Sequence, residues 1–403
     1  MFTRTLQSEL IDSSQHYPVT TVLGPRQSGK STLVRMTFPD KPYANMENPD
    51  DRRLALTDPR GFLSQYANGA IVDEVQQTPE LLSYIQTMVD EKQENGMFIL
   101  TGSHQPLLHQ AISQSLAGRT ALLTLLPLSM EEMKPMNLDF SVDDYLLSGG
   151  YPRIYAHHVE PTKAYRDYFQ TYVQRDVRQL VNVKDLSLFE KFMRLCAGRV
   201  GNLFEATALA NEVGVSGHTI QHWLSVLEAS FIIFRLQPYF ENFSKRMIKS
   251  PKLYFTDVGL ASYLLNIENV TQLNRDPLRG ALFENLVILE LMKYRLNRGK
   301  NPNLYFYRDH HQNEIDVIIA SGHHLIPVEI KSAQTFRVDF LKQLHFFQQL
   351  VKERMPTGFV IYAGRQEQAL QKNHLIHYAN TANIWQALDR ASKTNTESPP
   401  PHH

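Results

Sequence analysis

The chain has 403 residues, with 41 Lys or Arg against 41 Asp or Glu and a single cysteine, Cys196. This length allows about two to four domains with cores of their own. The balanced charge excludes a protein that is basic over its whole surface, and one cysteine excludes a disulfide framework and fits a reducing cytosol. No apolar run approaches the roughly 20 residues of a membrane span, and residues 1–10 lack a signal-peptide core, so we expect a cytoplasmic protein without a membrane partner.

The first strong motif is a phosphate-binding loop. Residues 22–34 read VLGPRQSGKSTLV and contain the pattern G-x-x-x-x-G-K-[ST] between a β-branched, apolar stretch and a stretch that can form a helix. This strand, loop and helix context separates a phosphate loop from a chance match. The glycines let backbone N–H groups turn inward around a phosphate, Lys30 places charge on the β and γ oxygens, and the Ser31 hydroxyl can hold Mg²⁺. The sequence therefore predicts a site for ATP and Mg²⁺ made by Gly24, Pro25, Arg26, Gln27, Ser28, Gly29, Lys30, Ser31 and Thr32.

Two adjacent carboxylates follow a later strand. Residues 42–47 give a second strand, and residues 69–74 give an apolar strand that ends in Asp73 and Glu74. After a phosphate loop, such a pair predicts one carboxylate for the Mg²⁺ shell and one for the attacking water. We assign Asp73 to the metal, directly or through water, and Glu74 to the water. Without the upstream loop, an Asp-Glu pair would be an ordinary surface feature.

A further buried strand, residues 97–103, ends in small polar side chains. The carboxyl ends of strands line the crevice of a parallel nucleotide-binding sheet, so Ser103 or Thr101 can reach the γ-phosphate or the water. Either side chain could instead cap the helix that follows. We favour Ser103 for the catalytic role and expect residues 121–126 to supply a fifth strand.

The order of these motifs resembles the AAA+ superfamily: a phosphate loop, Val-Asp-Glu at 72–74, Leu-Thr-Gly-Ser at 100–103 and Ser-Leu-Ala-Gly-Arg at 115–119. More closely, it is similar to the branch of bacterial and archaeal ATPases whose C-terminal half is a domain of unknown function. The resemblance implies a sensor-1 role for Ser103 and a place for Arg119 near the γ-phosphate of a neighbouring subunit. It thereby implies a ring-forming homo-oligomer, which we expect to be a hexamer. An isolated arginine before a strand is otherwise a solvated or salt-bridged surface group.

Residues 129–185 show a helical pattern. Ser129 precedes two glutamates, as at a capped helix start, and apolar residues between Tyr165 and Val181 recur at spacings of three and four. We interpret this region as a small helical lid that closes over nucleotide. Arg175 and Arg178 are alternative finger or sensor arginines, or members of a solvated helix face.

Residues 186–270 have the organisation of a winged helix. A helix at 204–213, a turn at 214–216 and a second helix starting at 217 precede a strand at 231–236, with which residues 253–255 can pair. This geometry places a recognition helix in the major groove of DNA, although winged helices also serve as protein-contact modules. DNA contacts are expected from the second helix and from the wing: His218, Thr219, Gln221, His222, Lys245, Arg246, Lys249 and Lys252.

The C-terminal region carries a second set of reactive side chains. The pattern predicts a helix, three strands, a helix and a strand at 279–297, 304–308, 314–320, 324–330, 338–351 and 358–363. This order resembles the restriction-endonuclease-like fold and its PD-(D/E)xK signature, with Ile315 in place of the proline. Asp316, Glu329 and Glu284 would then hold a divalent metal beside the ammonium of Lys331. The alternative is a nuclease-like scaffold used for binding or assembly, in which Glu329 and Lys331 form an ordinary same-face pair.

These patterns predict an α/β protein with an AAA+ P-loop core at 1–128, a helical lid at 129–185, a winged helix-turn-helix at 186–270, a restriction-endonuclease-like domain at 271–391 and a disordered tail at 392–403. The leading hypothesis is a ring-forming, Mg²⁺-dependent ATPase that couples hydrolysis to the binding and remodelling or translocation of DNA. The alternatives are an ATP-regulated endonuclease and an ATP-dependent signalling switch whose C-terminal half binds a protein partner.

Overall fold

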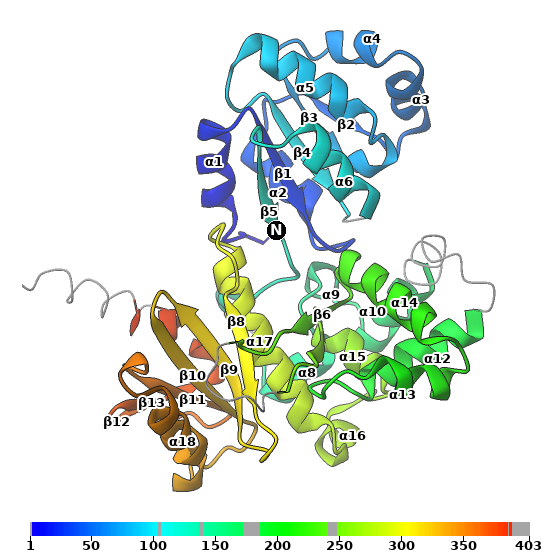
Figure 1. Cartoon of the computed structure of the whole chain (residues 1–403). Helices are drawn as coiled ribbons and strands as arrows, with labels where there is room; N and C mark the ends of the chain where they lie inside the picture. The colour runs from blue at the N-terminus through cyan, green and yellow to red at the C-terminus, as the bar shows by residue number, and fades with distance from the viewer. Residues whose placement is uncertain are drawn as a thin grey trace, which may run out of the picture.

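The computed structural model describes residues 2–103, 106–136, 140–171, 186–240, 248–385 and 387–388. Expectations for Arg175, Arg178, Lys245, Arg246 and residues 392–403 lie outside this part of the chain and stay predictions. Within it, none of the helices has the length and apolar character of a membrane span. Figure 1 shows two lobes, one coloured blue to cyan and the other green to red, and the chain passes from the first to the second after β5 (Thr120–Thr124).

The first lobe is built on a five-stranded sheet in the order β2-β3-β4-β1-β5, in which every neighbouring pair is parallel. Besides β5, its strands are β1 (Val19–Leu23), β2 (Tyr43–Asn45), β3 (Ala70–Asp73) and β4 (Phe98–Gly102). β1 lies between β4 and β5 and is buried along its whole length, as its β-branched sequence predicts. Because all strands run the same way, their carboxyl ends meet at one edge, where a ligand crevice is expected.

Helices cover both faces of this sheet. α1 (Gln7–His16) and α2 (Lys30–Thr37) pack on one face, in a core that includes Val22. The core on the other face includes Leu23, since successive strand residues point to opposite sides. That face is covered by α3 (Pro49–Thr57), α4 (Pro59–Ser64), α5 (Leu81–Lys92) and α6 (Pro106–Ser115), and a 3-10 helix, η1 (Val75–Gln77), follows β3.

The second lobe begins with short helices, which are α7 (Met130–Met133), η2 (Lys134–Met136), α8 (Val142–Ser148), α9 (Pro152–Ala156) and α10 (Pro161–Tyr168). The predicted long helix is described only up to residue 171. Next come α12 (Leu186–Ala197), α13 (Ala206–Val213) and α14 (Gly217–Ala229). Gly214 turns the chain between α13 and α14 with a φ of 90°, a conformation that favours glycine, and Ser216 caps α14.

The expected strand pair after α14 is present. β6 (Ile233–Leu236) and β7 (Lys252–Phe255) run antiparallel, with Ile233 opposite Phe255. Two further helices, α15 (Val258–Leu264) and α16 (Val270–Arg275), lead to α17 (Arg279–Leu296). The helix and strand order predicted from 279 onward is also confirmed.

That order consists of α17, β8 (Leu304–Arg308), β9 (Glu314–Ser321), β10 (His324–Lys331), α18 (Lys342–Val351) and β11 (Gly358–Tyr362). The sequence did not predict β12 (Gln368–Leu370) and β13 (Asn373–His377), which complete a six-stranded sheet in the order β12-β13-β11-β10-β9-β8. Short 3-10 helices are η4 (Val338–Leu341), η5 (Lys352–Arg354) and η6 (Tyr378–Asn380).

One continuous hydrophobic core runs through the second lobe, from Leu126 to Trp385. α17 lies at its centre, between the green helices and the sheet in Figure 1. Because neighbours surround it, α17 buries Leu282, Phe283 and every residue from Asn285 to Leu291, so this stretch of the helix has no solvent-facing side. The helical region and the C-terminal sheet therefore form one packed body.

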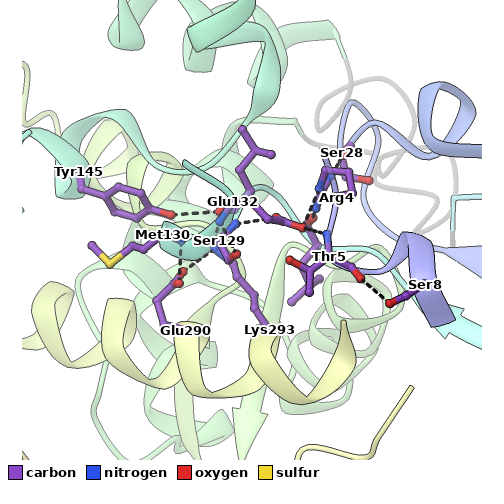
Figure 2. Close-up of polar contacts among 12 residues, drawn as sticks. Arg4, Thr5, Ser8, Ser28, Ser129, Met130, Glu132, Tyr145, Glu290 and Lys293 are labelled. Carbon is purple, nitrogen blue, oxygen red and sulfur yellow. Dashed lines mark hydrogen bonds and ion pairs between the residues drawn. The ribbon is translucent and has the colours of Figure 1, made fainter. Parts of the chain in front are cut away.

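A buried arginine joins the two lobes (Figure 2). Arg4 donates to the main-chain oxygens of Ser28 and Leu126, each at 2.6 Å, and its Nε lies 3.1 Å from the carboxylate of Glu132. The same carboxylate accepts from the backbone N–H of Ser129 at 2.9 Å, as part of a capping box at the start of α7. One cation thus fixes the phosphate loop, the end of β5 and the first helix of the second lobe.

The network continues into α17. The backbone N–H of Met130 donates to Glu290 at 2.8 Å, and Lys293 donates to Glu290 at 3.0 Å and to the carbonyl oxygen of Leu128 at 2.9 Å (Figure 2). Glu290 and Lys293 are both buried, so each depends on the other to compensate its charge.

Removing Arg4 should destabilise the protein. Arg4→Met leaves Glu132 buried without its counter-charge, and we expect the free energy of unfolding to fall by about 3 kcal/mol. Urea denaturation followed by circular dichroism measures the change. Arg337→Met is the matched control, because its ion pair with Asp339 is exposed and should contribute less than about 1 kcal/mol. Equal effects of the two substitutions would contradict the assignment.

Candidate nucleotide-binding site

The phosphate loop depends on its two glycines. A Cβ on Gly24 would lie 2.1 Å from the carbonyl oxygen of Leu125, so no larger residue fits beside the end of β5. Gly29 has a φ of 93°, in the left-handed region that side chains disfavour, and α2 begins at the next residue. The loop therefore leads from β1 into α2, the geometry that directs backbone N–H groups at a phosphate.

The predicted metal-binding residues lie together. The Ser31 hydroxyl donates to Asp73 Oδ1 at 3.0 Å, although the two residues are far apart in the sequence. Asp73 also accepts from the hydroxyl groups of Tyr43, at 2.5 Å, and Thr101. Hydroxyl and carboxylate oxygens are the ligands that Mg²⁺ prefers, so this pair fits the predicted ion.

Lys30 is buried at the same place. Its ammonium donates to the carbonyl oxygens of Gly24 and Pro25, at 3.1 and 2.8 Å. Burial lowers the pKa of Lys30, while the carboxylates of Glu74 and Asp73 act in the opposite direction. Lys30, the predicted phosphate ligand, thus lies in the electric field of Asp73, the predicted metal ligand, and of Glu74, the predicted base.

Gln76 joins Glu74 to Ser103. Its side-chain amide donates to the Glu74 carboxylate and, at 2.9 Å, to the hydroxyl of Ser103. Glu74 has a φ of 56°, a left-handed conformation that is rare outside glycine and is found at functional sites. Thr101, the alternative to Ser103, is bound to Asp73 instead. Gln76 and Tyr43 could not be predicted as site residues from the sequence, since neither belongs to a motif.

A cavity of about 580 Å³ opens beside these groups, a size suited to a small-molecule ligand. It is lined by the loop, α2 and Glu74, by the N-terminal segment with Phe2 and Arg4, and by Arg153 and His157 of the second lobe. None of these last four residues was predicted, because only the fold brings α9 and the first residues to the loop.

Comparisons with known proteins agree with this geometry. Residues 16–134 match the family described as "AAA domain", residues 139–271 match "Domain of unknown function (DUF8612)", and residues 279–381 match "Domain of unknown function (DUF4143)". The uncharacterized protein Rv2008c of Mycobacterium tuberculosis is 32% identical over 322 residues, which cover 79% of this chain and 71% of that protein. The chain belongs to the same family as this mycobacterial protein.

More distant similarities were also found. An uncharacterized protein of Haemophilus influenzae is 24% identical over 346 residues, covering 77% of this chain and 81% of its own. Among solved structures, the Walker-type ATPase paby2304 of Pyrococcus abyssi is 17% identical, with a TM-score of 0.43 over 66% of this chain and 96% of that one. The AAA domain and the C-terminal domain of unknown function confirm the coarse family prediction.

Arg119 lies at the other end of the AAA domain's sheet. It precedes β5, and its carbonyl oxygen accepts from the N–H of Val19 at the start of β1, whereas the phosphate loop follows the end of β1. Its guanidinium forms a bidentate pair with Asp90, at 2.5 and 2.8 Å. Arg119 therefore does not reach the phosphate loop of its own chain, and a role in a neighbouring subunit stays a prediction.

The predicted DNA contacts separate into two groups. His218, Gln221 and Lys249 are exposed, the first two on α14. Lys252 is only 2% exposed and forms ion pairs with Glu284 at 3.0 Å and with Glu314 at 2.5 Å. The prediction that Lys252 contacts DNA is therefore wrong, because a buried, paired ammonium cannot reach a phosphate.

The predicted nuclease-like residues form one cluster. Lys331 lies 2.6 Å from Glu329 and 3.5 Å from Asp316, and Glu284 faces Lys252. Burial, reinforced by the nearby Asp316, raises the pKa of Glu329 to about 8, while the Lys331 ammonium acts in the opposite direction. Among the residues that the structure describes, no group of three or more His, Cys, Asp or Glu is placed to hold a metal ion.

Proposed function

We propose that this protein is an Mg²⁺-dependent ATPase whose hydrolysis cycle controls nucleic-acid binding by the second lobe. The observation that carries the first part is the convergence of Lys30, Ser31, Asp73 and Glu74 at the carboxyl edge of the AAA domain's sheet, beside a cavity of about 580 Å³. Such an edge, at the N-terminus of a helix, combines backbone donors, one cation and two carboxylates, the groups that phosphoryl transfer needs.

The roles follow from the contacts. Ser31 and Asp73 would hold Mg²⁺, which neutralises charge on the phosphates when bound. Lys30 would exchange the carbonyl oxygens of Gly24 and Pro25 for phosphate oxygens. Glu74 would accept the proton of the attacking water, with its carboxylate held by Gln76.

Two side chains would sense the nucleotide. The side-chain amide of Gln76 donates to both Ser103 and Glu74. If Ser103 contacts the γ-phosphate, a change there would therefore reach Glu74, the proposed base, through Gln76. Arg153 lines the cavity from α9 and, within the described residues, forms no ion pair. Its charge is therefore free to meet a phosphate from the side of the second lobe.

The position of Arg119 supports a ring-forming oligomer, for which we propose a hexamer. Five strand residues, at about 3.3 Å each, separate its end of β1 from the phosphate loop, so its own nucleotide is out of reach. Arg119 would instead leave Asp90 and stabilise the phosphoryl group in the adjacent subunit.

The order of helices and strands from α13 to β7 supports the proposal that this part of the second lobe is a winged helix. α13 and α14 meet at a glycine turn, and the antiparallel β6 and β7 follow them, as in a helix-turn-helix with a wing. His218 and Gln221 on the exposed side of α14 would face a duplex, and Lys249 would bind a phosphate. The competing function is an assembly switch in which α14 binds a protein partner.

Replacing the proposed base should separate binding from turnover. Glu74→Gln keeps a side chain of the same size but cannot accept the proton, so we expect kcat to fall about 100-fold or more while ATP still binds. Phosphate release and the fluorescence of a labelled ATP analogue measure the two quantities. Glu80→Gln, an exposed residue before α5, is the matched control. Unchanged hydrolysis in the Glu74 variant would refute the assignment.

A trans role for Arg119 predicts complementation between inactive subunits. Arg119→Ala should bind ATP normally but turn over about 1000-fold more slowly. Lys30→Ala subunits lack a working phosphate loop but keep Arg119. Mixing the two variants should restore part of the turnover, measured as phosphate release against mixing ratio. Two variants that remain inactive at every ratio, although they co-assemble, would exclude this role.

Duplex binding should depend steeply on salt, because each phosphate contact releases counterions. Electrophoretic panels of single-stranded, duplex and branched DNA, run with a non-hydrolysable ATP analogue, measure the preference. Lys249→Ala should weaken binding to all sequences and reduce the salt slope by about one, whereas His218→Ala should alter sequence preference. Lys300→Ala, an exposed lysine beyond α17, is the control. Absence of DNA binding would favour the protein-partner switch.

A further inference from the structure

Lys252 stands at the centre of an acidic cluster in the second lobe. It begins β7, and its Nζ lies 2.5 Å from Glu314 Oε1 on β9 and 3.0 Å from Glu284 Oε1 on α17. The hydroxyl of Tyr254, two residues along the same face of β7, donates to the same oxygen of Glu284. Three elements from different parts of the chain therefore converge on one ammonium.

The position of Lys252 is fixed by its backbone and its surroundings. It pairs with Leu236 across the β6–β7 ladder and forms a second bridge with Leu203. Its Nζ lies 5.6 Å from the centre of the Phe306 ring, and the residue is 2% exposed. Because the main chain is held on both sides and the side chain is buried, the ammonium cannot withdraw into solvent.

The other carboxyl groups of the cluster are also bonded by protein donors. Glu314 Oε2 forms an ion pair with Arg308 at 3.0 Å. Asp316 accepts from the backbone N–H of Ile330 at 2.7 Å, and Lys331 bonds Glu329 at 2.6 Å. The remaining oxygen of Glu329 is buried with no hydrogen-bond partner among the described atoms.

The protein itself supplies the cations of this cluster. Four carboxyl groups, from Glu284, Glu314, Asp316 and Glu329, face three side-chain cations, from Lys252, Arg308 and Lys331. A divalent ion between Glu284 and Asp316 would add two positive charges beside a buried ammonium. Such like charges repel strongly at low dielectric, so the donor set does not fit a divalent metal.

We propose that the Lys252 ammonium permanently takes the place of a divalent cation in this cluster, so that the C-terminal domain neither binds a catalytic metal nor cuts nucleic acid. The cluster instead joins β7 to α17 and β9. Its role is to hold the proposed winged helix rigidly against the C-terminal sheet. This inference does not depend on ATP hydrolysis by the AAA domain.

Metal binding provides the test. The full chain with Ser31→Ala, which removes one of the two predicted metal ligands of the nucleotide site, is titrated with Mn²⁺ without nucleotide, and bound Mn²⁺ is measured by electron paramagnetic resonance. We expect that no Mn²⁺ bound by this chain depends on Asp316, so adding Asp316→Asn should leave Mn²⁺ binding unchanged. Adding Lys252→Ala leaves Glu284 without its cation and Glu314 with Arg308 alone, so one Mn²⁺ site should appear and be lost again in combination with Asp316→Asn.

The lysine substitution could also unfold the protein, so two further measurements keep the inference testable. Mn²⁺ should raise the melting temperature of the Lys252→Ala variant but not that of the parent. The parent chain should leave duplex, branched and single-stranded DNA intact with Mg²⁺ or Mn²⁺. Cutting that Lys331→Ala abolishes, or Mn²⁺ binding by the parent that Asp316→Asn abolishes, would overturn the proposal even if the lysine variant cannot be purified.

Discussion

The buried guanidinium of Arg4 holds the phosphate loop against the rest of the molecule. A charged group in this position is stable only if its hydrogen bonds are satisfied and its charge is compensated. The carbonyl oxygens of Ser28 and Leu126 accept hydrogen bonds from the two terminal nitrogens of the guanidinium, and the carboxylate of Glu132 compensates its charge. Because these partners belong to the loop, the end of β5 and α7, the pairing can be complete only when the three segments are correctly placed. The conformation of the nucleotide site is thereby linked to the position of the second lobe.

Other buried cations lie where parts of the chain meet. Lys293 on α17 bonds Leu128 and Glu290 at the junction of the lobes, and Lys252 joins β7 to α17 and β9. Hydrophobic packing alone is non-directional and tolerates small shifts, whereas a buried ion pair requires one geometry. In this protein, the apolar cores supply the bulk of the stability, and buried charges specify how the segments are arranged.

The sequence predicted the parts of the site that local patterns encode. The glycine spacing, the strand before the loop and the helix after it identified Lys30 and Ser31, and the parallel sheet explained why Asp73 lies beside them. Arg4 and Arg153 escaped detection because single arginines carry no pattern, and only the fold brings them to the cavity. Tertiary contacts of this kind cannot be read from spacing along the chain.

Lys252 shows how a pattern can mislead. It follows several basic residues, so it reads as part of a wing that binds phosphates, yet it is the first residue of a strand that is buried throughout. The alternation of strand side chains places Lys252 and Tyr254 on one face, and both contact Glu284. Lys252 is two residues from Tyr254 on the same strand, so a buried tyrosine indicates that the lysine side chain also points inward. Because Lys252 is buried, the proposed DNA surface lies on α14 and not on β7.

The packing of α17 determines how a change at the nucleotide can reach that surface. The loop acts on α7 through Arg4 and Glu132, and α7 acts on α17 through Met130 and Glu290. α17 is enclosed by the continuous core of the second lobe, and close-packed interiors transmit displacement rather than absorb it. A shift of α7 would therefore carry α14 and the C-terminal sheet together as one body. Nucleotide-driven motion should be concentrated at the junction after β5, where the two lobes are joined by buried polar contacts and by Phe231, which packs against the hydrophobic cores of both lobes.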